Sequence, residues 1–86
     1  MDKQWVVYIL RCSDDTLYTG ITPDLAARIA LHNQGKGAKY TRGRGPVIPV
    51  YQEICENYSQ ALRREYEIKH LSRKEKLSLC DKFQEK

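Results

Sequence analysis

Two short apolar segments decide the fold of this chain: Val7-Tyr8-Ile9 and, further along, Tyr18-Thr19-Gly20. Aliphatic and aromatic residues dominate positions 5–12, as in a strand of a sheet that is covered on both faces. Residues 16–21 have the composition of its hairpin partner, and the polar run Ser13-Asp14-Asp15-Thr16 separates the two segments. We therefore expect an antiparallel pair of strands with a tyrosine on each.

The hairpin register determines whether the two tyrosines face the same side of the sheet. A two-residue turn at Asp14-Asp15 would pair positions of opposite parity, and Tyr8 and Tyr18 would then lie on opposite faces. For both tyrosines to serve one site, the turn must contain an odd number of residues, for example through a bulge. We predict a turn of this kind.

Turn and capping signals divide the remainder of the chain. Thr22, Pro23 and Asp24 predict a helix start with Thr22 as the cap, and this helix should run to about residue 33 and stop at Gly35. Residues 35–49 hold four glycines and two prolines, which predicts a loop. A third strand is expected at 50–54, a second helix at 59–70 capped by Ser59, and a third helix at 72–83 opened by a capping box.

The resulting order, β-β-α-β-α-α, predicts an α+β fold with a small, mainly antiparallel three-stranded sheet flanked by three helices. We expect one domain over residues 1–86. The longest apolar runs are far shorter than the ~18 residues of a membrane span, and the N-terminus has no signal-peptide pattern. The three cysteines are widely spaced, which favours reduced thiols over disulfides or structural zinc. These features predict a soluble, cytoplasmic protein.

The net charge of +4 is concentrated in one segment. Residues 35–45 contain no acid, and their four cations equal the whole surplus: Lys36, Lys39, Arg42 and Arg44. This loop is therefore the candidate surface for a phosphate-rich partner, although a short basic loop can also be an ordinary solvated surface.

Arg28 and His32 lie one helical turn apart on the face that also carries Leu25 and Ile29. We expect both to project at the edge of a packed surface, where a guanidinium can grip a phosphate beside an imidazole that moves a proton. The alternative is an amphipathic helix with an arginine that reaches solvent and a histidine at the boundary.

Glu65 falls near the centre of the apolar stripe of the second predicted helix, between Ala61 and Ile68. A carboxylate that faces a core is costly unless it is paired or bound to a metal. It can form an ion pair with Lys69 one turn later, or it can hold a magnesium ion that keeps much of its hydration. Likewise, Tyr8 and Tyr18 can be half-buried packing residues with hydroxyl groups at the rim.

Together these segments resemble the GIY-YIG nuclease superfamily, and specifically its small standalone members. The resemblance covers about residues 6–79. It rests on an ordered set of strings: Val7-Tyr8-Ile9-Leu10, Tyr18-Thr19-Gly20-Ile21, Arg28 with His32-Asn33, Lys39-Tyr40-Thr41-Arg42, Glu65, and Ile68-Lys69 before Leu71-Ser72-Arg73. Val7 stands at the first glycine of the family's name motif and Thr19 at the isoleucine of the second.

The resemblance implies hydrolysis of phosphodiester bonds in nucleic acid. By position, Tyr8 would be the general base toward the attacking water and His32 would accept or relay its proton. Tyr18 would orient a phosphate oxygen or a water, Arg28 would bind the scissile phosphate, and Glu65 would hold one Mg²⁺ or Mn²⁺. Residues 35–45, called the basic loop below, would follow the nucleic-acid backbone through Lys36, Lys39, Tyr40, Arg42 and Arg44.

Several family nucleases use an asparagine downstream of the metal carboxylate, and no asparagine follows Glu65. Two alternatives therefore stay open beside a structure-selective nuclease of DNA repair or recombination: a nucleic-acid-binding module without the chemistry, and a protein-interaction domain with an acidic partner. DNA is expected over RNA, with recognition of backbone or branch shape. A partner protein could supply further specificity, and no membrane partner is expected.

Overall fold

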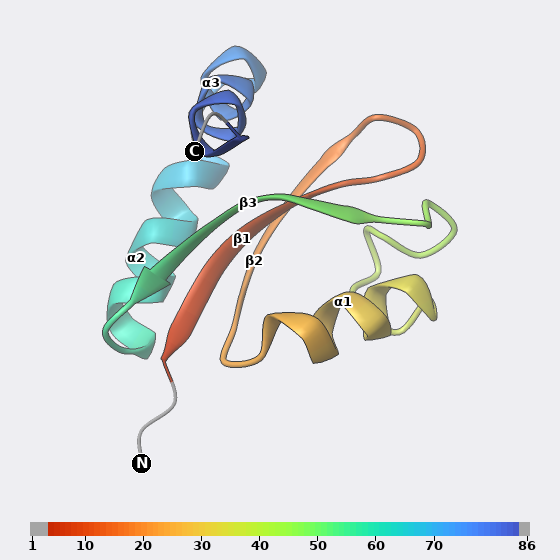
Figure 1. Ribbon diagram of the computed structural model, residues 1–86, viewed down its shortest axis with the longest axis horizontal. Coiled ribbons are helices and arrows are strands. Elements are labelled where there is room, and N and C mark those ends of the chain that lie inside the picture. Colours follow the sequence, from red (N-terminus) through yellow and green to blue (C-terminus); the bar gives the residue numbers. More distant parts are fainter. Residues whose placement is uncertain (1–3, 85–86) are drawn as a thin grey trace.

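The computed structural model describes residues 4–84, and within them the chain forms an antiparallel sheet of three strands in the order β2-β1-β3 with three helices (Figure 1). The elements follow one another as β1 (Trp5–Arg11), β2 (Leu17–Thr22), α1 (Leu25–Asn33), β3 (Ile48–Cys55), α2 (Tyr58–Lys69) and α3 (Arg73–Gln84). The predicted order β-β-α-β-α-α is confirmed. None of the helices in this described part combines the length and the apolar character that a membrane crossing requires.

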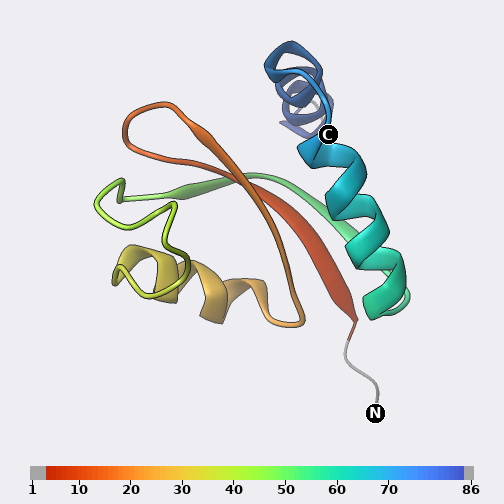
Figure 2. The ribbon, with the colours of Figure 1, turned by 180° about the vertical axis from the view of Figure 1, so that it is seen from behind.

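β1 is the central strand, and both of its faces are covered. Val7 and Ile9 pack in one cluster with Ala61 and Ile68 of α2, whereas Tyr8 belongs to a second cluster on the α1 side. Figures 1 and 2 show α1 and α2 on opposite sides of the sheet. Two-sided burial is the reason that this strand is apolar along most of its length.

The turn between β1 and β2 has odd length, as predicted. Pairing ends at Arg11 with Leu17, so the turn comprises residues 12–16, and Asp15 adopts a positive φ of 71° within it. Tyr8 lies opposite Gly20, and Tyr18 lies opposite Leu10. Because side chains of directly opposite residues share a face of the sheet, Tyr8 and Tyr18 emerge on the same side.

Two of the predicted helix caps were wrong. α1 is capped by Asp24 and not by Thr22, because the Asp24 carboxylate accepts a hydrogen bond from the Ala27 amide (3.2 Å). Thr22 ends β2 instead, and its hydroxyl accepts from the Asp24 amide (3.1 Å). The predicted end of α1 is confirmed, since Gly35 follows it with a φ of 77°.

α2 is capped by Asn57 and not by Ser59, because the Asn57 side chain accepts from the Gln60 amide (2.8 Å). In both corrected helices the residue in extended conformation just before the first turn is the one that can reach the third amide. The capping box of α3 is confirmed: Ser72 Oγ accepts from the Glu75 amide, and Glu75 accepts from the Ser72 amide.

β3 begins at Ile48, two positions before the predicted start, and includes Pro49. The register against β1 shifts between Ile9, opposite Tyr51, and Leu10, opposite Pro49, so that Val50 is the extra residue of a bulge. β3 is an edge strand, and a proline is tolerated there because one side of the strand needs no ladder partner.

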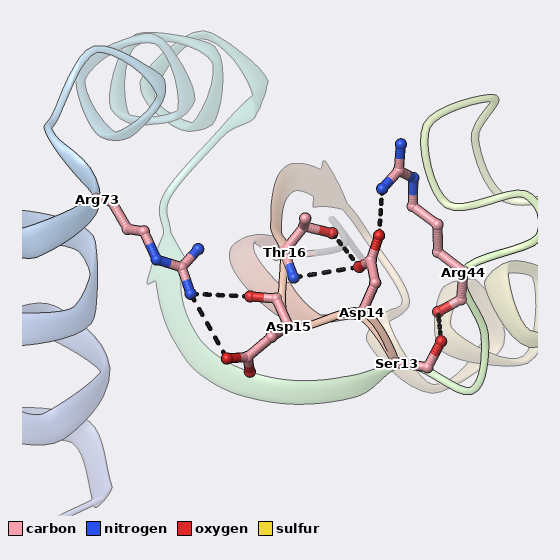
Figure 3. Close-up of polar contacts among 6 residues, drawn as sticks. All are labelled: Ser13, Asp14, Asp15, Thr16, Arg44 and Arg73. Carbon is pink, nitrogen blue, oxygen red and sulfur yellow. Dashed lines mark hydrogen bonds and ion pairs between the residues drawn. The ribbon is translucent and has the colours of Figure 1, made fainter.

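The hairpin turn also holds the loop between α1 and β3 in place (Figure 3). The Ser13 amide and hydroxyl both donate to the Arg44 carbonyl (2.8 and 2.9 Å), and the Arg44 guanidinium pairs with Asp14. From the other side, Arg73 of α3 donates to the Asp15 carbonyl (2.9 Å). The contacts of Ser13 and Asp14 with Arg44 hold the basic loop beside the hairpin turn, and the Arg73 contact joins α3 to the same turn.

Candidate functional site

A buried hydrogen bond between Tyr8 and His32 forms the centre of the candidate site. The Tyr8 hydroxyl lies 3.0 Å from His32 Nε2, and each side chain is only 1% exposed. Tyr8 comes from the middle of the central strand and His32 from the last turn of α1. Leu25 and Ile29 of α1 pack against the cluster that contains Tyr8, and this packing directs the helix face that carries His32 at the sheet.

The loop after α1 closes over the other side of the His32 ring. His32 Nδ1 lies 2.8 Å from the Thr41 hydroxyl, and that hydroxyl donates to the Ala38 carbonyl (3.1 Å). A Cβ atom at Gly37 would lie 2.5 Å from both Cγ and Nδ1 of His32. Only a glycine at position 37 therefore lets the loop pack this closely on the imidazole.

Tyr18 and Gly20 of β2 complete the wall around the phenol of Tyr8. The Tyr18 ring centroid lies 5.2 Å from that of His32 and 6.3 Å from that of Tyr8. A Cβ atom at Gly20 would lie 2.6 Å from the Tyr8 hydroxyl oxygen. The glycine that ends the second tripeptide thus leaves the space in which the phenol lies.

Arg28 precedes His32 by one turn of α1 and is partly buried. Its Nε atom is buried and has no hydrogen-bond partner among the described residues. A buried guanidinium nitrogen without a protein acceptor is costly, and an anionic oxygen would satisfy it. This atom makes the site a good fit for a phosphate group.

The electrostatic environment keeps the shared proton on Tyr8. Burial, followed by the nearby Tyr18, raises the pKa of Tyr8 to about 12, whereas Arg28 acts in the opposite direction. Burial and then the positive charge of Arg28 lower the pKa of His32 below its usual value. At neutral pH the pair is therefore a protonated phenol beside a neutral imidazole, which can accept a proton.

Glu65 of α2 also contributes to this environment. Its side chain is 19% exposed and pairs with Lys69 Nζ at 3.4 Å, so the ion pair considered from the sequence is present. Ala61 and Ile68 on either side of it are fully buried, as the predicted apolar stripe requires. The negative charge of Glu65 is one of the causes that raise the pKa of Tyr8, which places it within electrostatic range of the Tyr8–His32 pair.

The donor set fits a divalent cation that is held mainly by water and phosphate oxygens. Residues 4–84 contain no group of three metal-ligating side chains. Mg²⁺ commonly uses one or two carboxylates and completes its shell with water and substrate oxygens. Glu65, whose side chain is partly exposed, is the candidate ligand for an ion of this kind.

The basic loop reaches the site through Tyr40. Its ring stacks on Tyr18 with centroids 5.9 Å apart, and the Arg44 guanidinium lies 4.7 Å from the Tyr40 centroid. Arg44 also forms an ion pair with Asp14, which partly neutralises the charge of Arg44. The other three cations of this loop are exposed, and no ion pair engages them within residues 4–84: Lys36, Lys39 and Arg42.

The structure thus brings Tyr8, Tyr18, Arg28 and His32 together, with Tyr40 at the border of this group. Glu65 comes from α2, and its link to the group is the effect of its charge on the pKa of Tyr8. Sequence reasoning missed two further residues, Gly37 and Thr41. A glycine five residues after a helical histidine is a weak signal for close packing. Thr41 lies in the string Lys39-Tyr40-Thr41-Arg42 that contributes to the resemblance, but no role was assigned to it, because its contact with His32 depends on the path of the loop after α1.

The chain is similar in sequence to known proteins over most of its length. The GIY-YIG catalytic domain matches residues 4–78. The UPF0213 protein SH2523 of Staphylococcus haemolyticus is 57% identical over 75 residues, which is 87% of this chain and 92% of that protein. The UPF0213 protein OB0043 of Oceanobacillus iheyensis is 55% identical over 85 residues, which is 99% of this chain and 98% of that protein.

Two solved structures share the fold. The UPF0213 protein BH0048 from Bacillus halodurans has a TM-score of 0.59 and 50% identity, covering 91% of this chain and 83% of that one. The protein EF2693 from E. faecalis has a TM-score of 0.66 and 37% identity, covering 99% of this chain and 91% of that one.

Proposed function

This chain belongs to the GIY-YIG catalytic-domain family, and on that premise we propose that it is a metal-dependent endonuclease that hydrolyses phosphodiester bonds in nucleic acid. DNA is the expected substrate, selected by backbone or branch shape in repair or recombination. The observation that carries the proposal is the buried Tyr8–His32 hydrogen bond (3.0 Å) beside Arg28, whose buried Nε lacks a protein acceptor.

Tyr8 and His32 supply the proton transfer. The Tyr8 hydroxyl passes its proton to neutral His32, and the phenolate takes a proton from the water that attacks phosphorus. The new phosphorus–oxygen bond forms as the bond to the leaving sugar oxygen breaks, and the leaving oxygen acquires a proton from solvent. Because the pKa of Tyr8 is about 12 in the free protein, this transfer needs added positive charge near the phenol.

Arg28 and Glu65 handle the phosphate and its charge. Arg28 binds a non-bridging oxygen through the donors of its guanidinium and stabilises the charge that grows during attack. Glu65 would hold the divalent cation. When bound, such an ion neutralises negative charge on the phosphate and on the leaving oxygen. Tyr18 orients a phosphate oxygen or the water from the β2 side.

The runner-up function is a nucleic-acid-binding module of the same fold that does not cleave. It is favoured by the Glu65–Lys69 ion pair, which already satisfies the carboxylate, and by the lack of an asparagine after Glu65. For such a module the exposed cations Lys36, Lys39 and Arg42 would be sufficient.

The deciding experiment is cleavage of labelled duplex, single-stranded and branched DNA, with RNA alongside, in Mg²⁺, Mn²⁺ or EDTA. Glu65→Gln removes the candidate metal ligand and keeps the side-chain volume. Glu67→Gln is the matched control, since Glu67 is an exposed carboxylate on the same helix that pairs with Arg64 (3.8 Å). We expect metal-dependent cutting that Glu65→Gln abolishes and Glu67→Gln preserves. Binding without cutting, equal in all three proteins, would instead establish the binding module.

A further inference from the structure

Thr41 has an unusual place for a residue of a glycine-rich basic loop. Its side chain is only 1% exposed, although the neighbouring Tyr40 and Arg42 are exposed. Its hydroxyl makes two polar contacts, one to the Ala38 carbonyl of its own loop (3.1 Å) and one to His32 Nδ1 on α1 (2.8 Å). The hydroxyl therefore joins the loop to the candidate site.

These two contacts determine which nitrogen of His32 carries the proton. A threonine hydroxyl has one proton, and a carbonyl oxygen can only accept. The Thr41 hydroxyl therefore donates its proton to the Ala38 carbonyl. The oxygen of the Thr41 hydroxyl then accepts from an Nδ1–H group of His32. A neutral imidazole has one N–H, which leaves Nε2 with a lone pair that accepts the Tyr8 hydroxyl at 3.0 Å.

The reverse arrangement is unfavourable in this environment. If Thr41 donated to Nδ1, its oxygen and the Ala38 carbonyl oxygen would face each other at 3.1 Å with no proton between them. Tyr8 would then have to accept from Nε2–H, and its own proton would need another acceptor inside a buried site. Buried polar groups without hydrogen-bond partners are unfavourable, so this arrangement is disfavoured.

We propose that Thr41 is a positioning residue that holds His32 as the Nδ1–H tautomer, so that Nε2 is the acceptor for the Tyr8 proton. The proposal rests on the proposed function, because it assigns a direction to the proton transfer of that site. It also gives the basic loop a second role. The segment that carries Lys39 and Arg42 also holds the Ala38 carbonyl and the Thr41 hydroxyl, which together determine the tautomer of His32.

The test reads the tautomer directly by long-range ¹H–¹⁵N correlation of the His32 ring, without substrate or metal. The wild-type protein should show a protonated Nδ1 and an unprotonated Nε2. Thr41→Val, which keeps the shape and removes the hydroxyl, should move the proton to Nε2. Thr41→Ser should retain the wild-type pattern. Thr19→Val is the matched control, because Thr19 is a buried threonine on β2 whose position alternates with Tyr18 and Gly20 and so faces away from the site.

Cleavage rates measured on the same proteins extend the test. Thr41→Val should lose about 10²-fold or more, as expected when a proton acceptor is held in the wrong tautomer, while Thr41→Ser and Thr19→Val stay close to wild type. A protonated Nε2 in the wild-type protein overturns the proposal. This measurement is made on the wild-type protein, so it does not depend on whether any variant folds. Full activity of Thr41→Val would overturn it as well. If the protein binds without cutting but shows the expected tautomers, the positioning role stands and the proposed nuclease function fails.

Discussion

Tyr8 and His32 have opposite responses to burial, and this contrast governs the chemistry of the site. Burial raises the pKa of the phenol to about 12 and lowers the pKa of the imidazole. The free protein therefore keeps the proton on Tyr8, and the neutral imidazole of His32 is the hydrogen-bond acceptor beside it. Since Glu65 also raises the pKa of Tyr8, a cation bound at that carboxylate would favour ionisation of the phenol.

Replacing Tyr8 with phenylalanine removes one hydroxyl and little else. We expect Tyr8→Phe to lower the single-turnover cleavage rate by about 10²- to 10⁴-fold, the usual size of a general-base contribution. The free energy of unfolding should fall by only about 1–2 kcal/mol, because His32 Nε2 loses its partner while the packing stays. Cleavage assays and chemical denaturation check the two effects. Tyr66→Phe, at an exposed tyrosine of α2, is the control, and wild-type cutting by Tyr8→Phe would show that Tyr8 is not the base.

The hairpin is the element that brings the two tyrosines to one face. Its odd turn depends on Asp15, whose φ of 71° lies in the left-handed region. Aspartate and asparagine tolerate this conformation, whereas a β-branched residue does not. The salt bridges of Asp15 to Arg11 and Arg73 are both 3.9 Å long between exposed side chains, so they add little to stability.

The backbone requirement at position 15 can be separated from the charge. Asp15→Asn should change the free energy of unfolding by less than about 0.5 kcal/mol, because asparagine keeps the left-handed conformation. Asp15→Val should destabilise the protein by about 1–2 kcal/mol through backbone strain. Chemical denaturation measures both. Equal losses in the two variants would mean that the carboxylate, and not the turn conformation, matters at this position.

At the scale of the whole molecule, the exposed cations of the basic loop lie next to the candidate site. The loop that carries Lys36, Lys39 and Arg42 follows α1, and its Tyr40 stacks on Tyr18 (5.9 Å). The same loop is held to the hairpin turn through Ser13, Asp14 and Arg44 (Figure 3). A backbone phosphate bound by the loop would therefore lie near the Tyr8–His32 pair.

Salt dependence tests where the nucleic acid binds. Affinity for DNA should fall steeply with salt, and Lys39→Gln should reduce the slope of log K against log salt by about 1 if Lys39 contacts a phosphate. Lys82→Gln on α3 makes the same change in charge at an exposed position outside the loop. Titrations by fluorescence anisotropy at several salt concentrations should show an unchanged slope for this control. A slope for Lys39→Gln that is the same as that of Lys82→Gln and of the wild-type protein would mean that Lys39 does not contact a phosphate.

Much of this arrangement could be predicted from local patterns. The apolar segments around Tyr8 and Tyr18, the i,i+4 spacing of Arg28 and His32, and the capping box at Ser72 each involve residues close in sequence. Their geometry therefore follows from strand and helix periods. The caps at Asp24 and Asn57 were mispredicted because several neighbouring polar residues satisfy the same pattern. The chosen cap depends on where the preceding strand ends.

The sequence by itself determined the order of the elements, because strand and helix periods and turn signals act over short distances. The odd hairpin turn was predicted as the condition for Tyr8 and Tyr18 to share a face, and the structure has it. Only the tertiary structure decided that Thr41 reaches His32, that Gly37 packs on the imidazole, and that Glu65 lies within electrostatic range of Tyr8. These contacts join a loop, a helix and a strand that are distant in the chain. Their geometry depends on how the elements pack against one sheet, and no local pattern encodes that packing.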